Sequence, residues 1–194
     1  MNIVYLHGFQ SNSASIKGRQ LQRYCQEHHA DYHVHLPDLN APPLEVMQKI
    51  DDYMQQHSEV VLVGSSLGGF YATCAALKHG CRAVLINPVV EPWTVFAERF
   101  AEVDLPYQVH ENWCLDAQHL LDLKQLHHPT AHCLDKFLVL LQQGDEVLDY
   151  RDAQRYYSQG HPCALVITET HGQHAMTNFA EKIPMLLTFL SQHV

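Results

Sequence analysis

Short apolar segments alternate with longer amphipathic ones along almost the whole chain, and this alternation limits the possible folds more than any other feature. Six segments have the length and apolar character of buried strands: residues 3–6, 32–36, 59–63, 82–86, 137–141 and 163–168. Strands separated by helices form a parallel sheet whose two faces the helices cover. We therefore predict an α/β protein with about six mostly parallel strands and helices on both faces.

Four segments between the strands and one after the last strand have the character of helices. The expected helices are residues 13–29, 44–56, 67–79, 150–158 and 182–192. Gly80 is suited to end the third of these, because glycine adopts the left-handed backbone of a helix C-terminus without strain. Pro184 lacks an N–H group, so we expect it in the first turn of the last helix.

A chain of 194 residues, of which 46% are hydrophobic, predicts one domain spanning residues 1–194. From about residue 91 to 132 the alternation lapses, and we predict a small, helical, lid-like insertion there. It follows the fourth strand, so it is placed to cover the carboxyl edge of the sheet, where open α/β sheets have their sites. Its aromatic side chains either line an apolar pocket or form the insertion's own core: Trp93, Phe96, Phe100, Tyr107 and Trp113.

The charge balance disfavours a nucleic-acid partner. Asp and Glu total 21 and Lys and Arg total 12, which gives a net charge of −9 that would repel a phosphate backbone. No apolar run approaches the ~20 residues of a membrane-spanning helix. The chain begins without the basic and apolar segments of a signal peptide. We therefore expect a cytoplasmic protein that binds neither nucleic acid nor membrane.

The segment Gly64-Ser65-Ser66-Leu67-Gly68 matches the G-x-S-x-G pattern of a nucleophile elbow. It directly follows the strongest predicted strand and opens a predicted helix of small residues, which is the strand–turn–helix setting that the elbow requires. Such a turn strains the central serine and presents its Oγ at the edge of the sheet, while side chains at the two glycines would collide with neighbouring elements. The pattern therefore indicates Ser66 as the nucleophile.

A serine nucleophile needs a histidine base and a carboxylate that orients it, and in α/β-hydrolases these follow in the order Ser, Asp, His. Asp145 lies just past the fifth predicted strand, with Glu146 as its nearest rival. Asp149 and Asp152 suit the start of the next helix instead. After the sixth strand His171 and His174 compete, and the position of His174 beyond the Gly172 turn favours it as the base. We predict Asp145 as the acid.

An oxyanion hole needs two backbone N–H groups that point at the developing negative charge. One is expected from Leu67, the residue after the nucleophile. The other is expected from the loop His7-Gly8-Phe9-Gln10 after the first strand, with Phe9 as the donor.

Five blocks resemble the α/β-hydrolase superfamily and, within it, the YqiA/YcfP-type small bacterial serine esterases. They are YLHGFQSN (5–12), VGSSLGGFYAT (63–73), INPVVEPW (86–93), LLQQGDEVLDYR (140–151) and GQHAMTNF (172–179). Their order and spread over nearly the whole chain make the resemblance specific. It implies a compact α/β-hydrolase fold whose sheet begins at the strand before the HG loop. It also implies a serine esterase with Ser66, Asp145 and His174 as its triad.

The 16 histidines raise the question of a metal site. His33 and His35 share one face of a predicted edge strand, and three more gather in the insertion: His127, His128 and His132. No H-E-x-x-H or cysteine–histidine spacing accompanies them. We predict no metal and no organic cofactor, and we expect most of the histidines to lie on the surface.

These features together predict a serine esterase that hydrolyses small-molecule acyl esters through an acyl-enzyme intermediate. An acyl thioesterase would use the same triad, and the residues do not separate the two. A non-catalytic ligand-binding module on the same fold is a third reading, since a fold does not determine function. An intact set of triad candidates favours the enzyme.

Overall fold

The computed structural model describes residues 1–102, 105–111, 113–128, 134–159 and 161–192. Its centre is a six-stranded sheet in the order β2-β1-β3-β4-β7-β8, and every neighbouring pair is parallel, as the alternation predicted. The strands are β1 (Asn2–Leu6), β2 (His33–His35), β3 (Val60–Ser65), β4 (Ala83–Ile86), β7 (Phe137–Gln142) and β8 (Leu165–Glu169). The predicted edge strand carrying His33 and His35 is β2.

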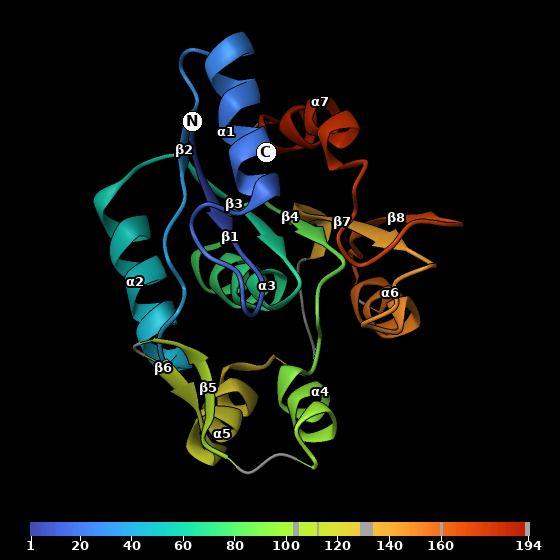
Figure 1. Ribbon diagram of the computed structural model, residues 1–194. Coiled ribbons are helices and arrows are strands. Elements are labelled where there is room, and N and C mark those ends of the chain that lie inside the picture. Colours follow the sequence, from blue (N-terminus) through green and yellow to red (C-terminus); the bar gives the residue numbers. More distant parts are fainter. Residues whose placement is uncertain (103–104, 112, 129–133, 160, 193–194) are drawn as a thin grey trace.

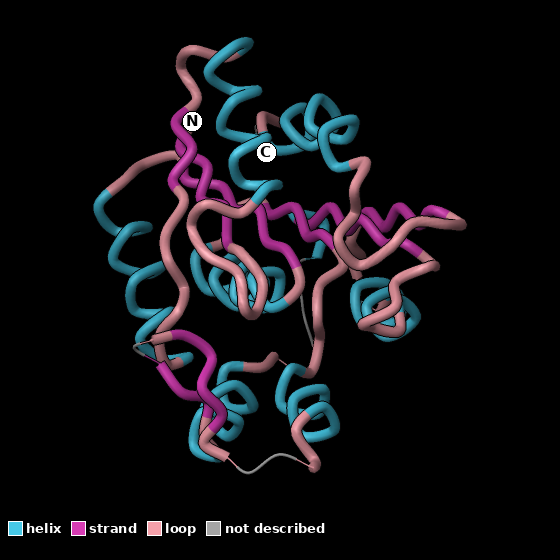
Figure 2. The backbone as a smooth tube through the Cα atoms, in the orientation of Figure 1, coloured by secondary structure: helices cyan, strands magenta, loops and turns pink. Residues whose placement is uncertain are grey.

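Helices cover both faces of the sheet (Figures 1 and 2). One face packs on α1 (Ile16–His28) and α7 (Phe179–Leu190) through a core that includes Ile3 and Tyr5. The other packs on α2 (Pro43–Gln56), α3 (Leu67–His79) and α6 (Tyr150–Ser158) through a core that includes Val4 and Leu6. Successive residues of β1 thus enter opposite cores, because side chains alternate across a strand.

The last helix differs from its prediction. α7 begins at Phe179 rather than near residue 182, and Pro184 lies inside it instead of in its first turn. Phe179 is fully buried, so packing extends the helix toward its N-terminus. Pro184 and Ala180 both lie on the exposed side, where water can bond the Ala180 carbonyl that has no N–H partner.

The insertion contains helices, as predicted, together with strands that the sequence did not predict. Between α4 (Pro92–Arg99) and α5 (Ala117–Leu126) it contains a two-stranded antiparallel hairpin, β5 (Tyr107–His110) and β6 (Trp113–Leu115). Residues of β5 alternate between half-buried and exposed, which is a strand pattern too short to stand out in the sequence. Figure 1 shows these elements gathered on one side of the molecule.

The carboxyl ends of the strands meet at one edge of the sheet. Leu6 lies beside Gly64, Ser65 beside Ile86, and Gln142 beside Glu169. The segments that follow these ends carry all the predicted site residues, so the parallel topology brings them together. Within the part of the chain that the structure describes, no helix has the length and apolar character needed to cross a membrane.

Candidate active site

Ser66 occupies a sharp turn between β3 and α3. Its φ of 56° and ψ of −119° are unusual for a residue with a side chain. A Cβ atom on Gly64 would lie 2.3 Å from the Gly68 carbonyl oxygen, and one on Gly68 would lie 2.0 Å from the Leu6 carbonyl oxygen. Both positions therefore require glycine, because helix α3 packs directly against the strands at this turn.

The backbone of Ser66 is held on both sides. Its N–H donates to the Ile86 carbonyl at 3.0 Å, and its carbonyl accepts from the Val89 N–H at 3.3 Å. Gly8 lies against the serine side chain, since a Cβ on Gly8 would be 3.1 Å from Ser66 Cβ and 3.7 Å from its Oγ. Ser66 itself is only half-buried. The loop after β1 therefore passes close to the predicted nucleophile.

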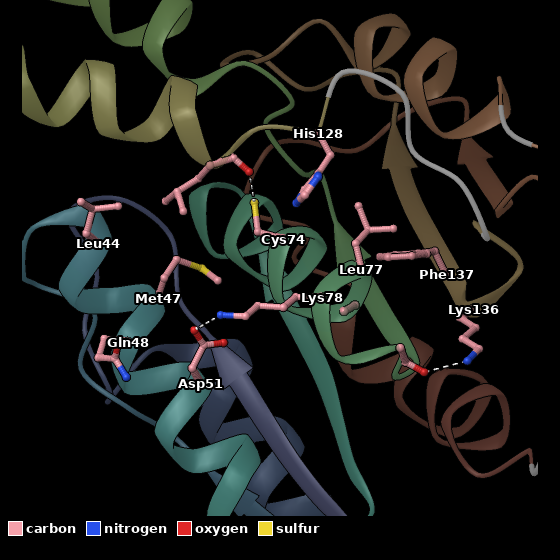
Figure 3. A pocket seen from close by; sticks show the side chains of 13 residues that line it. Leu44, Met47, Gln48, Asp51, Cys74, Leu77, Lys78, His128, Lys136 and Phe137 are labelled. Carbon is pink, nitrogen blue, oxygen red and sulfur yellow. Dashed lines mark hydrogen bonds and ion pairs between the residues drawn. The ribbon is translucent and has the colours of Figure 1, made fainter.

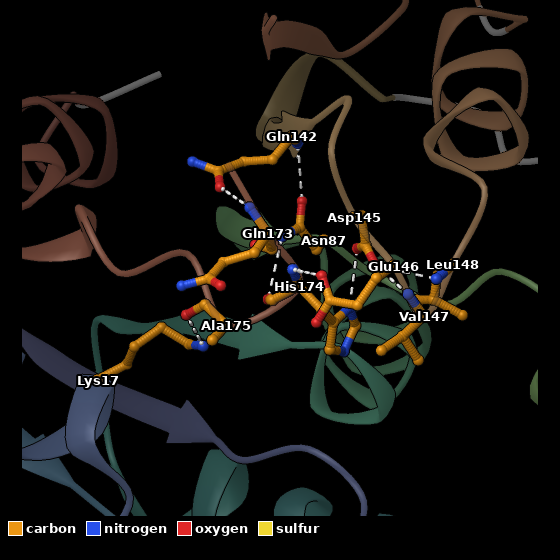
Figure 4. A network of polar contacts seen from close by, with 10 residues as sticks. All are labelled: Lys17, Asn87, Gln142, Asp145, Glu146, Val147, Leu148, Gln173, His174 and Ala175. Carbon is orange, nitrogen blue, oxygen red and sulfur yellow. Dashed lines mark hydrogen bonds and ion pairs between the residues drawn. The ribbon is translucent and has the colours of Figure 1, made fainter. Parts of the chain in front are cut away.

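Asp145 and His174 are joined by a direct contact: Oδ2 of the carboxylate lies 2.8 Å from Nδ1 of the imidazole (Figure 4). The other carboxylate oxygen, Oδ1, accepts the N–H groups of Val147 and Leu148, both at 2.9 Å. The Asp145 side chain is 2% exposed and that of His174 is 19% exposed. With Nδ1 bound by Asp145, Nε2 is the ring nitrogen left for a reacting group.

The rival residues have other contacts. The Glu146 carboxylate accepts the backbone N–H of His174 at 3.0 Å instead of contacting the imidazole. Asp149 caps α6 by accepting the N–H of Arg151, and Asp152 lies in the first turn of that helix. His171 is exposed. Among the acid and base candidates, the described contacts therefore pair Asp145 with His174.

Asn87 links the segments that carry Ser66 and His174. The residue before it, Ile86, accepts the Ser66 N–H through its carbonyl. Asn87 Nδ2 donates to the His174 carbonyl at 3.1 Å. Among the described residues, no hydrogen bond joins Ser66 Oγ to the imidazole. Catalytic hydrogen bonds are often long before substrate binds and shorten in the complex.

Sequence reasoning missed Asn87 and Gln142, which are each 2% exposed. Both are polar residues that end or follow an apolar strand, and that position is the signal that could have found them. Asn87 also has a positive φ of 41°, a region that asparagine enters more readily than most residues. Their side chains contact the segment that carries His174.

The two N–H groups predicted for the oxyanion hole have no acceptor among the described residues. Leu67 is the first residue of α3, where N–H groups have no partner within the helix. The N–H of Phe9 likewise donates to none of the described residues. Both therefore remain available to a ligand, as the proposed role requires.

His7 anchors the loop that carries Phe9. Leu39 N–H donates to its Nε2 at 2.9 Å, so the proton is on Nδ1, which donates to the Gly8 carbonyl at 2.9 Å. Burial lowers the pKa of His7, against the opposing influence of the nearby Asp38 carboxylate. The neutral imidazole therefore ties this loop to the segment after β2.

Lys17 of α1 is a further charged group at this edge. Its Nζ donates to the Ala175 carbonyl at 2.7 Å, one residue beyond His174 (Figure 4). Burial lowers the pKa of Lys17, while the Asp145 charge opposes that effect. Lys17 thereby attaches α1 to the segment that carries the predicted base.

The insertion packs on the loop after β1. The Phe9 ring lies 4.6 Å from Phe96, 6.1 Å from Phe100 and 6.3 Å from Trp113, measured between ring centroids. The neighbouring Gln10 side chain contacts the hydroxyl of Tyr107 at 3.0 Å. Because Phe96, Phe100 and Trp113 are buried in this cluster, they form the insertion's core together with Phe9.

Two cavities lie outside the cluster of predicted site residues. One of about 530 Å³ lies between the loop after β4, α4 and α6, and its wall includes Val147 and Leu148, whose N–H groups bind Asp145. A larger one of about 780 Å³ lies between α2 and α3 (Figure 3), where Asp51, Lys78 and Cys74 line it. None of the predicted catalytic residues lines either cavity.

The histidines do not assemble a metal site within the described residues, where no group of three potential ligands lies close enough to hold an ion. His35 and His57 instead stack on the two sides of Tyr53, with ring centroids 4.4 and 4.0 Å away. Of the three histidines predicted to cluster in the insertion, His132 lies outside the described residues.

Known proteins similar to this chain share its fold. Residues 2–191 match the family described as "Uncharacterised protein family (UPF0227)". UPF0227 protein YcfP of Salmonella gallinarum is 23% identical over 192 residues, covering 96% of this chain and 97% of that protein. Among solved structures, alpha/beta hydrolase domain-containing protein 10 from mouse has a TM-score of 0.74 at 16% identity, covering 98% of this chain and 90% of that one.

Est1E from Butyrivibrio proteoclasticus, solved with ferulic acid bound, has a TM-score of 0.71 at 12% identity, covering 97% of this chain and 88% of that one. At these identities the solved structures establish the fold alone. The predicted α/β-hydrolase fold and the resemblance to the YcfP type are thereby confirmed.

Proposed function

The chain belongs to the uncharacterised protein family UPF0227, and we propose that it is a serine hydrolase that cleaves small carboxylic esters through an acyl-enzyme. The observation that carries the proposal is the pairing of Asp145 with His174 at the sheet edge where the strained Ser66 stands. Structural neighbours that include a pyrethroid hydrolase support hydrolysis as the reaction class.

In the proposed mechanism Ser66 Oγ attacks the ester carbonyl carbon while His174 Nε2 takes the hydroxyl proton. Asp145 holds the imidazole in the tautomer with its proton on Nδ1 and stabilises the charged ring. The imidazolium then protonates the departing alcohol, which leaves an acyl group on Ser66. A water molecule activated by the same histidine releases the carboxylic acid and restores the serine.

The tetrahedral intermediate places a negative charge on the former carbonyl oxygen. The N–H groups of Phe9 and Leu67, which have no acceptor among the described residues, would donate to that oxygen. Oriented backbone dipoles of this kind stabilise the transition state without rearrangement. The proposed chemistry uses no metal ion and no organic cofactor.

The experiment that tests this function is Ser66→Ala, assayed on a 4-nitrophenyl ester of a short acyl chain. We expect kcat to fall by at least ~10³-fold, because the residual rate comes only from binding and the oxyanion hole. Ser65→Ala is the matched control: the neighbouring serine is buried in β3, and the variant should keep most of the activity. Retention of activity by Ser66→Ala would refute the nucleophile assignment.

A fluorophosphonate probe gives a second readout, because it labels only an activated serine. Labelling of the wild-type chain but not of Ser66→Ala is expected. Absence of labelling would favour a ligand-binding module on this fold. Matched oxyester and thioester substrates would then separate the esterase from a thioesterase.

A further inference from the structure

The four backbone polar groups of Gln173 and His174 are all bonded to side chains from elsewhere in the chain (Figure 4). Gln173 N–H donates to Gln142 Oε1 at 2.7 Å, and His174 N–H donates to Glu146 Oε2 at 3.0 Å. The carbonyl oxygens of Gln173 and His174 accept from Asn87 Nδ2 at 3.3 and 3.1 Å. We call Asn87, Gln142 and Glu146 the histidine clamp.

Asn87 suits its place in the histidine clamp because its amide is both donor and acceptor. While Nδ2 donates to the two carbonyls, Oδ1 accepts the Gln142 N–H at 2.9 Å. Aspartate could accept that N–H but would present a second oxygen to two carbonyl oxygens. An apolar residue would remove the partner of the Gln142 N–H and of the His174 carbonyl, whereas the Gln173 carbonyl would keep its bond from the Met176 N–H.

The clamp also connects the base to the nucleophile. Ser66 N–H bonds to the Ile86 carbonyl, and Asn87 is the next residue. Gln142 is braced in turn, because its Nε2 donates to Glu169 Oε2 at 2.8 Å and to Asn178 Oδ1 at 2.9 Å. The ends of β4 and β7 and the start of α7 thus set the position of the His174 backbone relative to Ser66.

A clamp is needed here because the segment has no regular structure of its own. Gly172 and Met176, on either side of His174, have φ values of 92° and 47°. The contact with Asp145 orients the imidazole ring but does not hold the backbone of His174, and the bond from Lys17 reaches only the next residue, Ala175. The His174 N–H also holds the pKa of the Glu146 carboxyl below its usual range, so this acceptor is charged at neutral pH.

We propose that Asn87, Gln142 and Glu146 are positioning residues that set the distance between the His174 imidazole and Ser66 Oγ. The inference rests on the proposed serine hydrolase function and adds residues to it. A base misplaced by about 1 Å costs up to 10²-fold in rate, so loss of the clamp should reduce kcat while substrate binding is kept.

Glu146 offers the cleanest test because it is exposed and its replacement does not disturb the core. Glu146→Ala should lower kcat about tenfold, with KM and the thermal midpoint unchanged, since one of the four bonds is lost. Glu146→Gln keeps a carbonyl oxygen for the His174 N–H and should restore most of kcat. Asn87→Asp should cost about 10²-fold in kcat, because the His174 and Gln173 carbonyls lose the Asn87 donor and face a carboxylate oxygen instead.

A second measurement separates positioning from general loss of structure. In a His174→Ala background, Glu146→Ala and Asn87→Asp should cause no further loss, because residues that act through one group are not additive. An equal fold-loss in both backgrounds would overturn the proposal. So would wild-type kcat in Glu146→Ala, or in a folded Asn87→Asp variant.

The histidine clamp and the serine hydrolase function can be refuted separately. If His174→Ala abolishes the ester hydrolysis but the clamp variants keep wild-type rates, the clamp is wrong and the serine hydrolase stands. If His174→Ala hydrolyses esters as fast as the wild type, the proposed function and the clamp are both refuted.

Discussion

The carboxylate of Asp145 contacts Nδ1 of His174 with one oxygen, at 2.8 Å, and two backbone N–H groups with the other. This division fixes the carboxylate plane before any substrate arrives. It also means that the acid cannot turn away from the imidazole without losing two hydrogen bonds. The side chain is 2% exposed, so water does not readily replace these partners.

Replacing the acid should therefore be far more damaging than replacing its neighbour. Asp145→Asn is expected to lower kcat about 10³–10⁴-fold, because an amide can face the imidazole with its NH₂ group and favour the wrong tautomer. Glu146→Gln, which keeps the acceptor for the His174 N–H, is the matched control and should stay close to the wild type. Similar losses in the two variants would show that the acid is misassigned.

The nucleophile turn should tolerate no side chain at Gly68. An added Cβ would lie 2.0 Å from the Leu6 carbonyl oxygen, so Gly68→Ala must displace α3 or β1. We expect the free energy of unfolding in urea to fall by about 3 kcal/mol or more.

Gly80→Ala provides the comparison for Gly68. Gly80 has a φ of 68°, but the nearest atom to its added Cβ would be Lys136 Nζ at 3.8 Å. Only the backbone strain remains, which costs about 1–2 kcal/mol. Equal destabilisation by the two alanines would contradict the packing described for the turn.

Stability should fall on acidification because of His7. Burial places the pKa of the folded-state imidazole below that of the unfolded chain, so the unfolded state takes up its proton first as the pH falls. The stabilising contribution is complete above the unfolded value of about 6.5 and is lost as the pH falls toward the folded value. Protonation would also break the Leu39 N–H bond to Nε2.

His7→Gln removes this titration and isolates it from the other histidines. Between pH 7 and pH 5 the wild type should lose more free energy of unfolding in urea than His7→Gln does. Parallel pH profiles for the two proteins would rule out His7 as the source.

The contact between Phe9 and the insertion should link stability with catalysis. Phe9→Ala removes a half-buried ring from the cluster with Phe96, Phe100 and Trp113, and we expect it to cost about 2–3 kcal/mol. It should also lower kcat on the ester, because the loop that presents the Phe9 N–H loses its support. Phe9→Leu keeps an apolar side chain in the cluster, so its stability and its kcat should lie between those of the wild type and of Phe9→Ala. If Phe9→Ala kept the wild-type kcat, the packing of Phe9 on the insertion would not be needed to position the Phe9 N–H.

Substrate charge should matter at the cavity beside the acid. Its wall carries the basic Arg155 against the acidic Glu91, Glu98, Asp149 and Asp152, and the whole chain carries a net charge of −9. We expect neutral or cationic esters to be hydrolysed with a higher kcat/KM than anionic esters of equal length, by about tenfold at low salt. The preference should shrink as ionic strength rises. A preference for anionic esters would show that the substrate does not bind in this acidic cavity.

Much of this fold can be predicted from the sequence because the patterns that indicate its strands and turns are local. Strands such as residues 59–63 are short apolar runs, and the turn around Ser66 is marked by glycines that the adjoining backbone requires. The parallel topology then brings the strand ends, and the residues after them, to one edge. Ser66, Asp145 and His174 could be proposed as candidates because each one follows the end of a predicted strand.

Local signals failed where packing overrode them. The hairpin β5–β6 has too short an alternation to reveal itself without the partner strand that completes it. α7 starts early because the buried Phe179 joins the core, and this leaves Pro184 inside the helix on its exposed side.

The sequence by itself thus determined the sheet, the elbow and a short set of candidates for each proposed role. Only the tertiary structure paired Asp145 rather than Glu146 with the His174 imidazole, placed Phe9 in the core of the insertion, and joined Asn87 to the His174 carbonyl. The physical reason is the distance along the chain: Asp145 and His174 are 29 residues apart, and Asn87 and His174 are 87 apart. No local pattern encodes such contacts, which exist only once the strands have paired.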